Sequence, residues 1–105
     1  MPSIHFVERL NNVKKLPDAP NEWESGYWFV SEETASKLTG GKLYLHSAQN
    51  APSHFGGEIL GYRVHQDSSR LDINGRIVFR IRATHEYKNI VTGRDGWGNE
   101  KKLVW

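Results

Sequence analysis

The sequence predicts a small, mostly β domain of the α+β class: a partly closed β-barrel of five to six strands with one or two short helices. Short segments rich in Val, Ile, Leu, Phe and Tyr alternate with clusters of Gly, Pro, Asn and Ser, as strands alternate with turns. One segment carries both a start and a stop signal for a helix. A chain of 105 residues suits a single domain, and a sheet of this size hides its edges by closing on itself.

The N-terminal quarter has the least regular pattern. Apolar residues at positions 4, 6 and 7 suit a strand or a short helix, but the Pro17–Asn21 run then interrupts any regular element. We therefore expect residues 1–25 to form an N-terminal arm packed on or near the barrel. Gly26–Ser31 is the clearest first strand. Its alternation places apolar side chains on both faces, which predicts a central strand.

A short helix is expected after this strand. Ser31 is a preferred N-cap residue, and Glu32 and Glu33 suit the positive end of a helix dipole. The Gly40-Gly41 pair is a stop signal after about two turns.

The stretch from Lys42 to Val64 organises the rest of the chain. Its two apolar runs, Lys42–His46 and Glu58–Val64, are typical of neighbouring strands. The polar loop between them covers residues 47–57, which is long for a hairpin and marks it as a candidate functional loop. Gly56 and Gly57 in this loop permit a turn of the backbone or the close approach of another group.

The C-terminal part predicts further short strands. Arg76–Thr84 follows an Asn-Gly turn signal and alternates in the manner of a strand. Glu86–Val91 either continues this strand or forms an edge strand. A glycine-rich loop over residues 92–99 surrounds Trp97, and Lys101–Trp105 is expected to close the sheet.

The composition limits the possible classes of function. A mean hydropathy of −0.65 and a longest apolar run of only Tyr27–Val30 exclude a membrane-spanning helix. Because cysteine is absent, disulfides, thiolate metal sites and cysteine nucleophiles are excluded. The N-terminus lacks the pattern of a secretory signal, so we expect a cytoplasmic protein. A net charge of +2 permits nucleic acid binding without strongly predicting it.

One sequence motif and the order of the predicted elements are similar to those of a known protein superfamily. A strand that ends in Ser (Tyr27–Ser31) leads into a short helix and then a hydrophobic strand (Leu43–His46). Ser53–Gly57 reads Ser-His-Phe-Gly-Gly and is followed by Ile59-x-Gly61. This phrase is similar to the Ser-Gly-His-Phe-x-Gly phrase of YTH domains, without its first Gly. Over roughly residues 26–84 the chain resembles the PUA-like superfamily, which includes the EVE, YTH and ASCH domains.

The resemblance implies a nucleic-acid-binding module that holds a flipped or modified base of DNA or RNA in an aromatic pocket on the barrel. Aromatic rings stack on the face of a base, while polar groups contact its edge and cations contact phosphate. We expect no catalytic residue, metal or cofactor. The candidate ligand-binding residues are Trp28, Ser31, Tyr44, His46, Ser53, His54, Phe55 and Trp97, and the candidate phosphate-binding residues are Arg63, Arg80 and Arg82.

Other interpretations of the same residues stay open. Trp28 also suits a buried core position, and the arginines suit a solvated strand face on which Glu58 or Glu86 pairs with them. The short chain and its aromatic content also suit a small protein-interaction module, such as a phage or bacterial inhibitor or adaptor. A minor alternative is a metal-independent ribonuclease that uses His46 and His54, because imidazole titrates near neutral pH.

Overall fold

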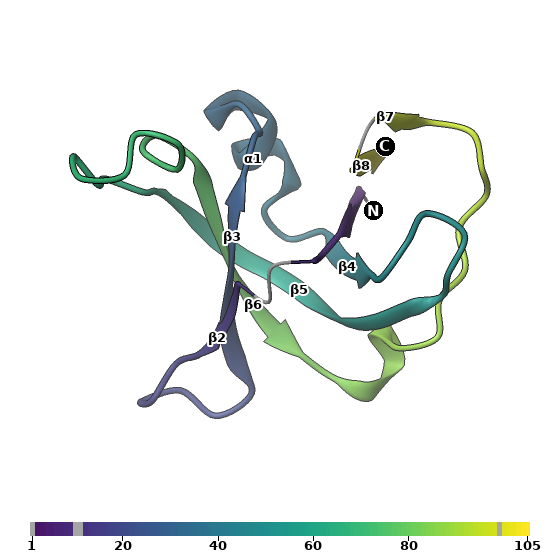
Figure 1. The fold of residues 1–105 in the computed structure, drawn as a ribbon. Coiled ribbons are helices and arrows are strands. Elements are labelled where there is room, and N and C mark those ends of the chain that lie inside the picture. The colour runs from purple at the N-terminus through teal and green to yellow at the C-terminus, as the bar shows by residue number, and fades with distance from the viewer. Residues whose placement is uncertain (1, 10–11, 99) are drawn as a thin grey trace.

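The computed structural model describes residues 2–9, 12–98 and 100–105, which form one open eight-stranded sheet, one α-helix and one 3-10 turn (Figure 1). Within these residues, no helix has the length and apolar character needed to cross a bilayer. The elements in chain order are β1 (Ser3–Val7), β2 (Val13–Lys15), β3 (Glu22–Trp28), α1 (Glu32–Leu38), β4 (Lys42–His46), β5 (Ser53–Val64), β6 (Ile77–Ala83), the 3-10 turn η1 (His85–Tyr87), β7 (Trp97–Gly98) and β8 (Lys101–Val104).

The strands follow the order β2-β3-β6-β5-β4-β1-β8-β7. Neighbours are antiparallel except for β1 and β4, which run parallel. The mostly β fold is therefore confirmed, but the partly closed barrel of five to six strands is not, because the sheet is open and has more strands. β1 and β8 lie across from the C-terminal end of β3 without pairing with it (Figure 1). We call this gap between β3 and the strands β1 and β8 the seam.

The N-terminal region differs most from the expectation of an arm. β1 lies inside the sheet between β4 and β8, and all five of its residues are buried. β2 pairs with the first half of β3, which spans Glu22–Trp28 rather than Gly26–Ser31. Residues 1, 10 and 11 of the predicted arm, and Asn99 at the end of the predicted glycine-rich loop, lie outside the described residues.

The predicted helix is confirmed. The Ser31 hydroxyl oxygen accepts a hydrogen bond of 3.1 Å from the backbone N–H of Thr34, as an N-cap residue should. Ala35 and Leu38 are its buried residues, and they join the core of the sheet. Gly40 follows the helix with a φ of +89°, a conformation that favours glycine.

The strand β4 is confirmed, but the loop after it is shorter than predicted. β5 begins at Ser53, so only residues 47–52 connect the two strands. Gly56 and Gly57 lie within β5, where a Cβ atom would collide with the backbone carbonyl oxygens of Leu43 and Arg82 respectively. These glycines therefore serve the close approach of neighbouring strands and make no turn.

The later strands mostly match their predictions. β6 and β8 form where expected, and Gly75 of the Asn-Gly turn has a φ of +84°. Glu86–Val91 forms no strand, since it contains the end of η1 and a loop. The hydrophobic core lies on one face of the curved sheet and is covered by α1. Its fully buried members are Ile4, Phe6, Ala35, Leu38, Leu43, Leu45, Ile59, Ile77, Phe79 and Ile81.

The glycines of β5 offer a matched test of this packing. Gly56→Ala should lower the free energy of unfolding by about 1–3 kcal/mol, because its methyl group forces the strands apart. Gly61→Ala on the same strand should change it by less than about 0.5 kcal/mol, because no atom from outside residues 60–62 lies within 4 Å of that Cβ position. Urea unfolding followed by circular dichroism measures both. Equal midpoints for the two variants would contradict the strand packing described.

Candidate functional site

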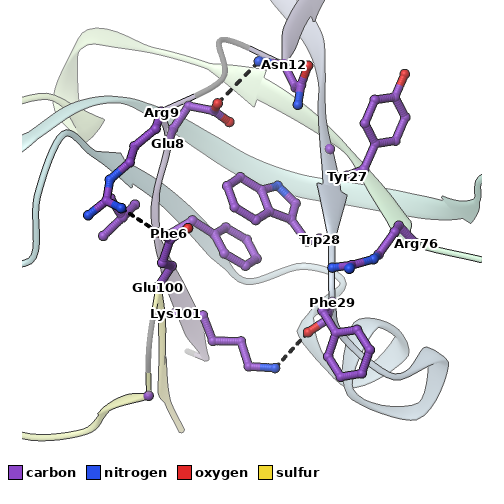
Figure 2. Close-up of a pocket in the computed structure, with 13 residues that line it drawn as sticks. Phe6, Glu8, Arg9, Asn12, Tyr27, Trp28, Phe29, Arg76, Glu100 and Lys101 are labelled. Carbon is purple, nitrogen blue, oxygen red and sulfur yellow. Dashed lines mark hydrogen bonds and ion pairs between the residues drawn. The ribbon is translucent and has the colours of Figure 1, made fainter. Parts of the chain in front are cut away.

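The main pocket of the described structure opens at the seam and has a volume of about 730 Å³ (Figure 2). It is lined by the C-terminal end of β1 and the residues after it, by the C-terminal end of β3, and by Gly98, Glu100 and Lys101, with Arg76 beside them. The pocket thus exists because the sheet curves back on itself without closing. Trp28 is the one predicted ligand-binding residue that lines it.

A fixed aromatic pair forms one wall of this pocket. The Trp28 ring stacks on Phe6 across the seam, with ring centroids 3.9 Å apart and planes within 8° of parallel. The indole N–H of Trp28 donates a 3.0 Å hydrogen bond to the Ser25 hydroxyl oxygen. Because Phe6 and Ser25 are buried, the indole is held in place from its face and from its edge. Trp28 is therefore both a core residue and a pocket wall.

Two further rings flank Trp28 in the sequence. Tyr27 packs against His65, with ring centroids 4.5 Å apart. Phe29 follows the end of β3 and is 75% exposed. Figure 2 shows Tyr27 and Phe29 on the β3 side of the pocket and Phe6 on the opposite side.

Charged groups surround these rings. The guanidinium carbon of Arg76 lies 5.0 Å from the centroid of Phe29, and the Lys101 ammonium lies 5.8 Å from it. Lys101 also donates a 2.7 Å hydrogen bond across the seam to the backbone carbonyl oxygen of Phe29. Arg9, in contrast, forms a 2.7 Å ion pair with Glu100. The pocket therefore combines a flat aromatic wall with a cationic rim.

Three other predicted ligand-binding residues, Tyr44, His46 and Trp97, gather on the opposite face of the sheet. In the parallel register of β1 and β4, Ile4 and Leu43 face the core, so His5 and Tyr44 share the other face. His5 and Tyr44 stack with ring centroids 4.7 Å apart.

Trp97 approaches the edge of both His5 and His46, at centroid distances of 6.3 and 5.7 Å. Its indole N–H is buried and has no hydrogen-bond partner among the described residues. Trp97 thus belongs with the histidines and does not line the seam pocket.

Two buried histidines form the centre of this second cluster. The Nδ1–H of His46 donates a 2.8 Å hydrogen bond to the carbonyl oxygen of Ala51, which fixes its tautomer. Its Nε2 then accepts a 2.9 Å hydrogen bond from Nδ1–H of His5. Burial, followed by the charge repulsion of His46 and Lys102, lowers the pKa of His5 to about 4. Burial also lowers the pKa of His46. Both rings are therefore neutral at pH 7.

The predicted loop residues have local structural partners. The Ser53 hydroxyl donates a 2.6 Å hydrogen bond to the carbonyl oxygen of Tyr87 and accepts a 2.9 Å bond from the N–H of Ile90. Ser53 thus fastens the segment after β6 to the sheet. Phe55 meets the edge of Trp23 at a centroid distance of 5.1 Å.

His54 is exposed, within electrostatic reach of His46. Because His46 is fully buried with both ring nitrogens engaged, its geometry does not favour the ribonuclease alternative, which stays a prediction.

Each predicted phosphate-binding arginine forms an ion pair with a glutamate. Arg63 contacts both carboxylate oxygens of Glu24 at 3.1 Å. Arg80 contacts Glu22 at 2.6 Å. Arg82 lies 3.4 Å from Glu58, which is the partner that the sequence allowed for. The hydrogen bonds from Arg63 lower the pKa of Glu24, so this pair is charged at neutral pH.

The structure thus divides the predicted residues among several places. Trp28 lines the seam pocket, and Ser31 is engaged as the helix cap. Tyr44, His46 and Trp97 meet around His5 on the other face. Sequence reasoning missed Phe6, Phe29, Arg76 and Lys101. The one available signal was the run Tyr27–Phe29, since three consecutive rings cannot all enter one core.

Comparisons with protein-family models, with curated proteins and with solved structures found no match. Among the described residues, no three His, Cys, Asp or Glu side chains are grouped as metal ligands would be. The proposals below therefore depend on the geometry of this chain.

The histidine pair predicts a pH dependence of stability. A pKa near 4 in the folded state, below the ordinary 6.5, means that the unfolded chain binds protons more readily. The contribution of His5 is therefore fully present above pH 6.5 and decreases as the pH falls toward 4. Between about pH 7 and pH 5, the free energy of unfolding should fall by about 2 kcal/mol. Chemical denaturation at a series of pH values measures it.

Two variants separate this effect from general acid sensitivity. His5→Asn should reduce the slope of stability against pH, with the remainder due to His46, whereas exposed His85→Asn should keep it. Wild-type stability that stays level over this pH range would contradict the buried neutral pair.

Proposed function

We propose that the protein is a nucleic-acid-binding module that holds one unstacked base, flipped or in a single strand, in the seam pocket. The observation that carries this proposal is the rigid Trp28–Phe6 wall beside an exposed ring, Phe29, with two cations next to it. The resemblance of the chain to PUA-like domains supports the same function, but we assign it to a different set of residues.

The size and chemistry of the pocket suit such a ligand. Its volume of about 730 Å³ lies within the range of small-molecule sites and exceeds what a single base needs. A base offers a flat π face to aromatic side chains and a polar edge to hydrogen-bonding groups. Glu8 and Asn12 line the pocket, and both have polar side chains. We therefore assign stacking to the rings and reading of the base edge to this polar group of side chains.

The preformed wall explains how binding could be favourable in so small a protein. Trp28 is already immobilised by Phe6 and Ser25, so little conformational entropy is lost when a ring stacks beside it. Stacking of a base on an aromatic side chain contributes about 1–3 kcal/mol.

A protein partner is the second candidate, and the exposure of Phe29 next to Arg76 favours it. Aromatic and arginine side chains are common anchors of protein interfaces. The two candidates differ in their response to salt, since nucleic acid binding releases counterions and weakens steeply as salt increases.

Phe29 provides the cleanest test, because its exposure means that truncation should leave the fold intact. Phe29→Ala should weaken binding of a labelled single-stranded oligonucleotide by about tenfold through loss of stacking. Leu71→Ala is the matched control, because Leu71 is 80% exposed and does not line the pocket. Fluorescence anisotropy at low salt, with DNA and RNA probes, measures both. Equal binding by the two variants, or no binding by the wild type, would refute the proposed function.

A further inference from the structure

Two groups of cations in this protein differ in their partners: the arginines of β5 and β6, and the cations beside Phe29. Arg63, Arg80 and Arg82 lie on neighbouring strands of the sheet, and each has a carboxylate within 3.4 Å. Glu24 and Glu22 are largely shielded from solvent, with side chains 24% and 18% exposed. A phosphate that recruited Arg63 or Arg80 would leave a poorly hydrated carboxylate without its partner, which is costly. Arg63 and Arg80 are therefore poor phosphate ligands, although the strand pattern predicts them as candidates.

Arg76 and Lys101 form the second group. In the described part of the chain, neither forms an ion pair with a carboxylate. Asp72, the acidic residue whose charge interacts with Arg76, is itself paired with Arg70 at 3.1 Å. Both cations lie over the Phe29 ring, and both line the seam pocket. The free positive charge of the pocket is thus concentrated beside its exposed ring.

We infer that Arg76 and Lys101 form a phosphate subsite of the seam pocket, which binds the backbone phosphate next to the held base. This inference rests on the proposed function and specifies where the ligand's charge is bound. The phosphate of a nucleotide is separated from its base by one sugar. A base stacked beside Trp28 or Phe29 therefore places a phosphate near the two cations, with the sugar directed out of the pocket.

The present hydrogen bond of Lys101 is one that the ammonium can exchange for a hydrogen bond to a phosphate. Its ammonium donates to a neutral acceptor, the carbonyl oxygen of Phe29, at 2.7 Å. A phosphate oxygen is a stronger acceptor for an ammonium than a neutral carbonyl oxygen is, because it carries a negative charge that attracts the cation. The flexible stem of a lysine allows the ammonium to move to a nearby anion. Arg76 offers a planar guanidinium that can donate two parallel hydrogen bonds to the same phosphate.

The salt dependence of binding tests the subsite directly. For single strands, the logarithm of the association constant falls with the logarithm of salt concentration with a slope of about −0.7 per phosphate contacted. Arg76→Met and Lys101→Met should each make this slope shallower by about 0.7, and the double variant by about 1.4. Arg82→Met is the control, because it removes the same charge from an exposed ion pair on the sheet. It should leave the slope close to that of the wild type.

The measurement uses the full chain and a labelled single-stranded oligonucleotide between about 50 and about 200 mM salt. Unchanged slopes for both pocket variants, with binding retained, would overturn the phosphate subsite and leave the proposed function standing. A shallower slope for Arg82→Met alone would overturn it in favour of the strand arginines. Absence of binding by the wild type would instead refute the proposed function, and the subsite with it. Circular dichroism of each variant shows whether the fold is retained.

Discussion

The contact between Phe6 and Trp28 is the interaction on which the rest of the structure depends. It joins β1 to β3, which lie on opposite sides of the seam and share no backbone hydrogen bonds in the sheet. In a closed barrel, backbone hydrogen bonds would join two such strands. In this protein, two large stacked rings lie between them instead. The rings complete the core of a sheet too open to enclose it with backbone alone, and stacking of this kind adds about 0.5–1.5 kcal/mol beyond burial of area. The same contact leaves a pocket beside it. Because the sheet does not close, the core needs these two rings to complete it, and the candidate site lies in the gap that remains.

The alternation of β1 then decides which residues can act together. Phe6 faces the core and the seam, whereas its neighbour His5 faces the other side of the sheet, where it meets Tyr44 and His46. A residue cannot contribute to both faces of a strand, so a ligand in the seam pocket cannot contact the histidine cluster. That cluster is instead covered by the chain after β6, which the buried Ser53 hydroxyl holds to β5. The two ring nitrogens of His46 are satisfied by His5 and by the carbonyl oxygen of Ala51, which suits a structural role on that face.

Local patterns predicted the elements whose identity depends on nearby residues. β4, β6, β8 and the Ser31-capped helix all follow from short-range alternation or capping, and they were placed well. The pattern left two interpretations open at Gly56 and Gly57, because a glycine required by the close approach of a neighbouring strand looks identical to one required by a turn. The candidate site was less predictable, since its rings come from two strands that meet only after the sheet has curved. Of the predicted ligand-binding residues, Trp28 alone lines the pocket.

The arrangement of charge also depends on residues that are distant from one another in the sequence. Alternating arginines on β6 suggest a basic strand face, but the strands on either side of β6 supply a carboxylate to each of them, from Glu22 on β3 and Glu58 on β5. The face is therefore close to neutral, although the strand that carries it is basic. A net charge of only +2 can still produce a local positive potential where cations lack such partners. Arg76 precedes β6 and Lys101 begins β8, so both lie where strands end at the seam, and neither forms an ion pair with a carboxylate of the described residues. In this open sheet the arginines of β5 and β6 are thus neutralised by neighbouring strands, whereas Arg76 and Lys101 keep their charge at the gap where pairing stops.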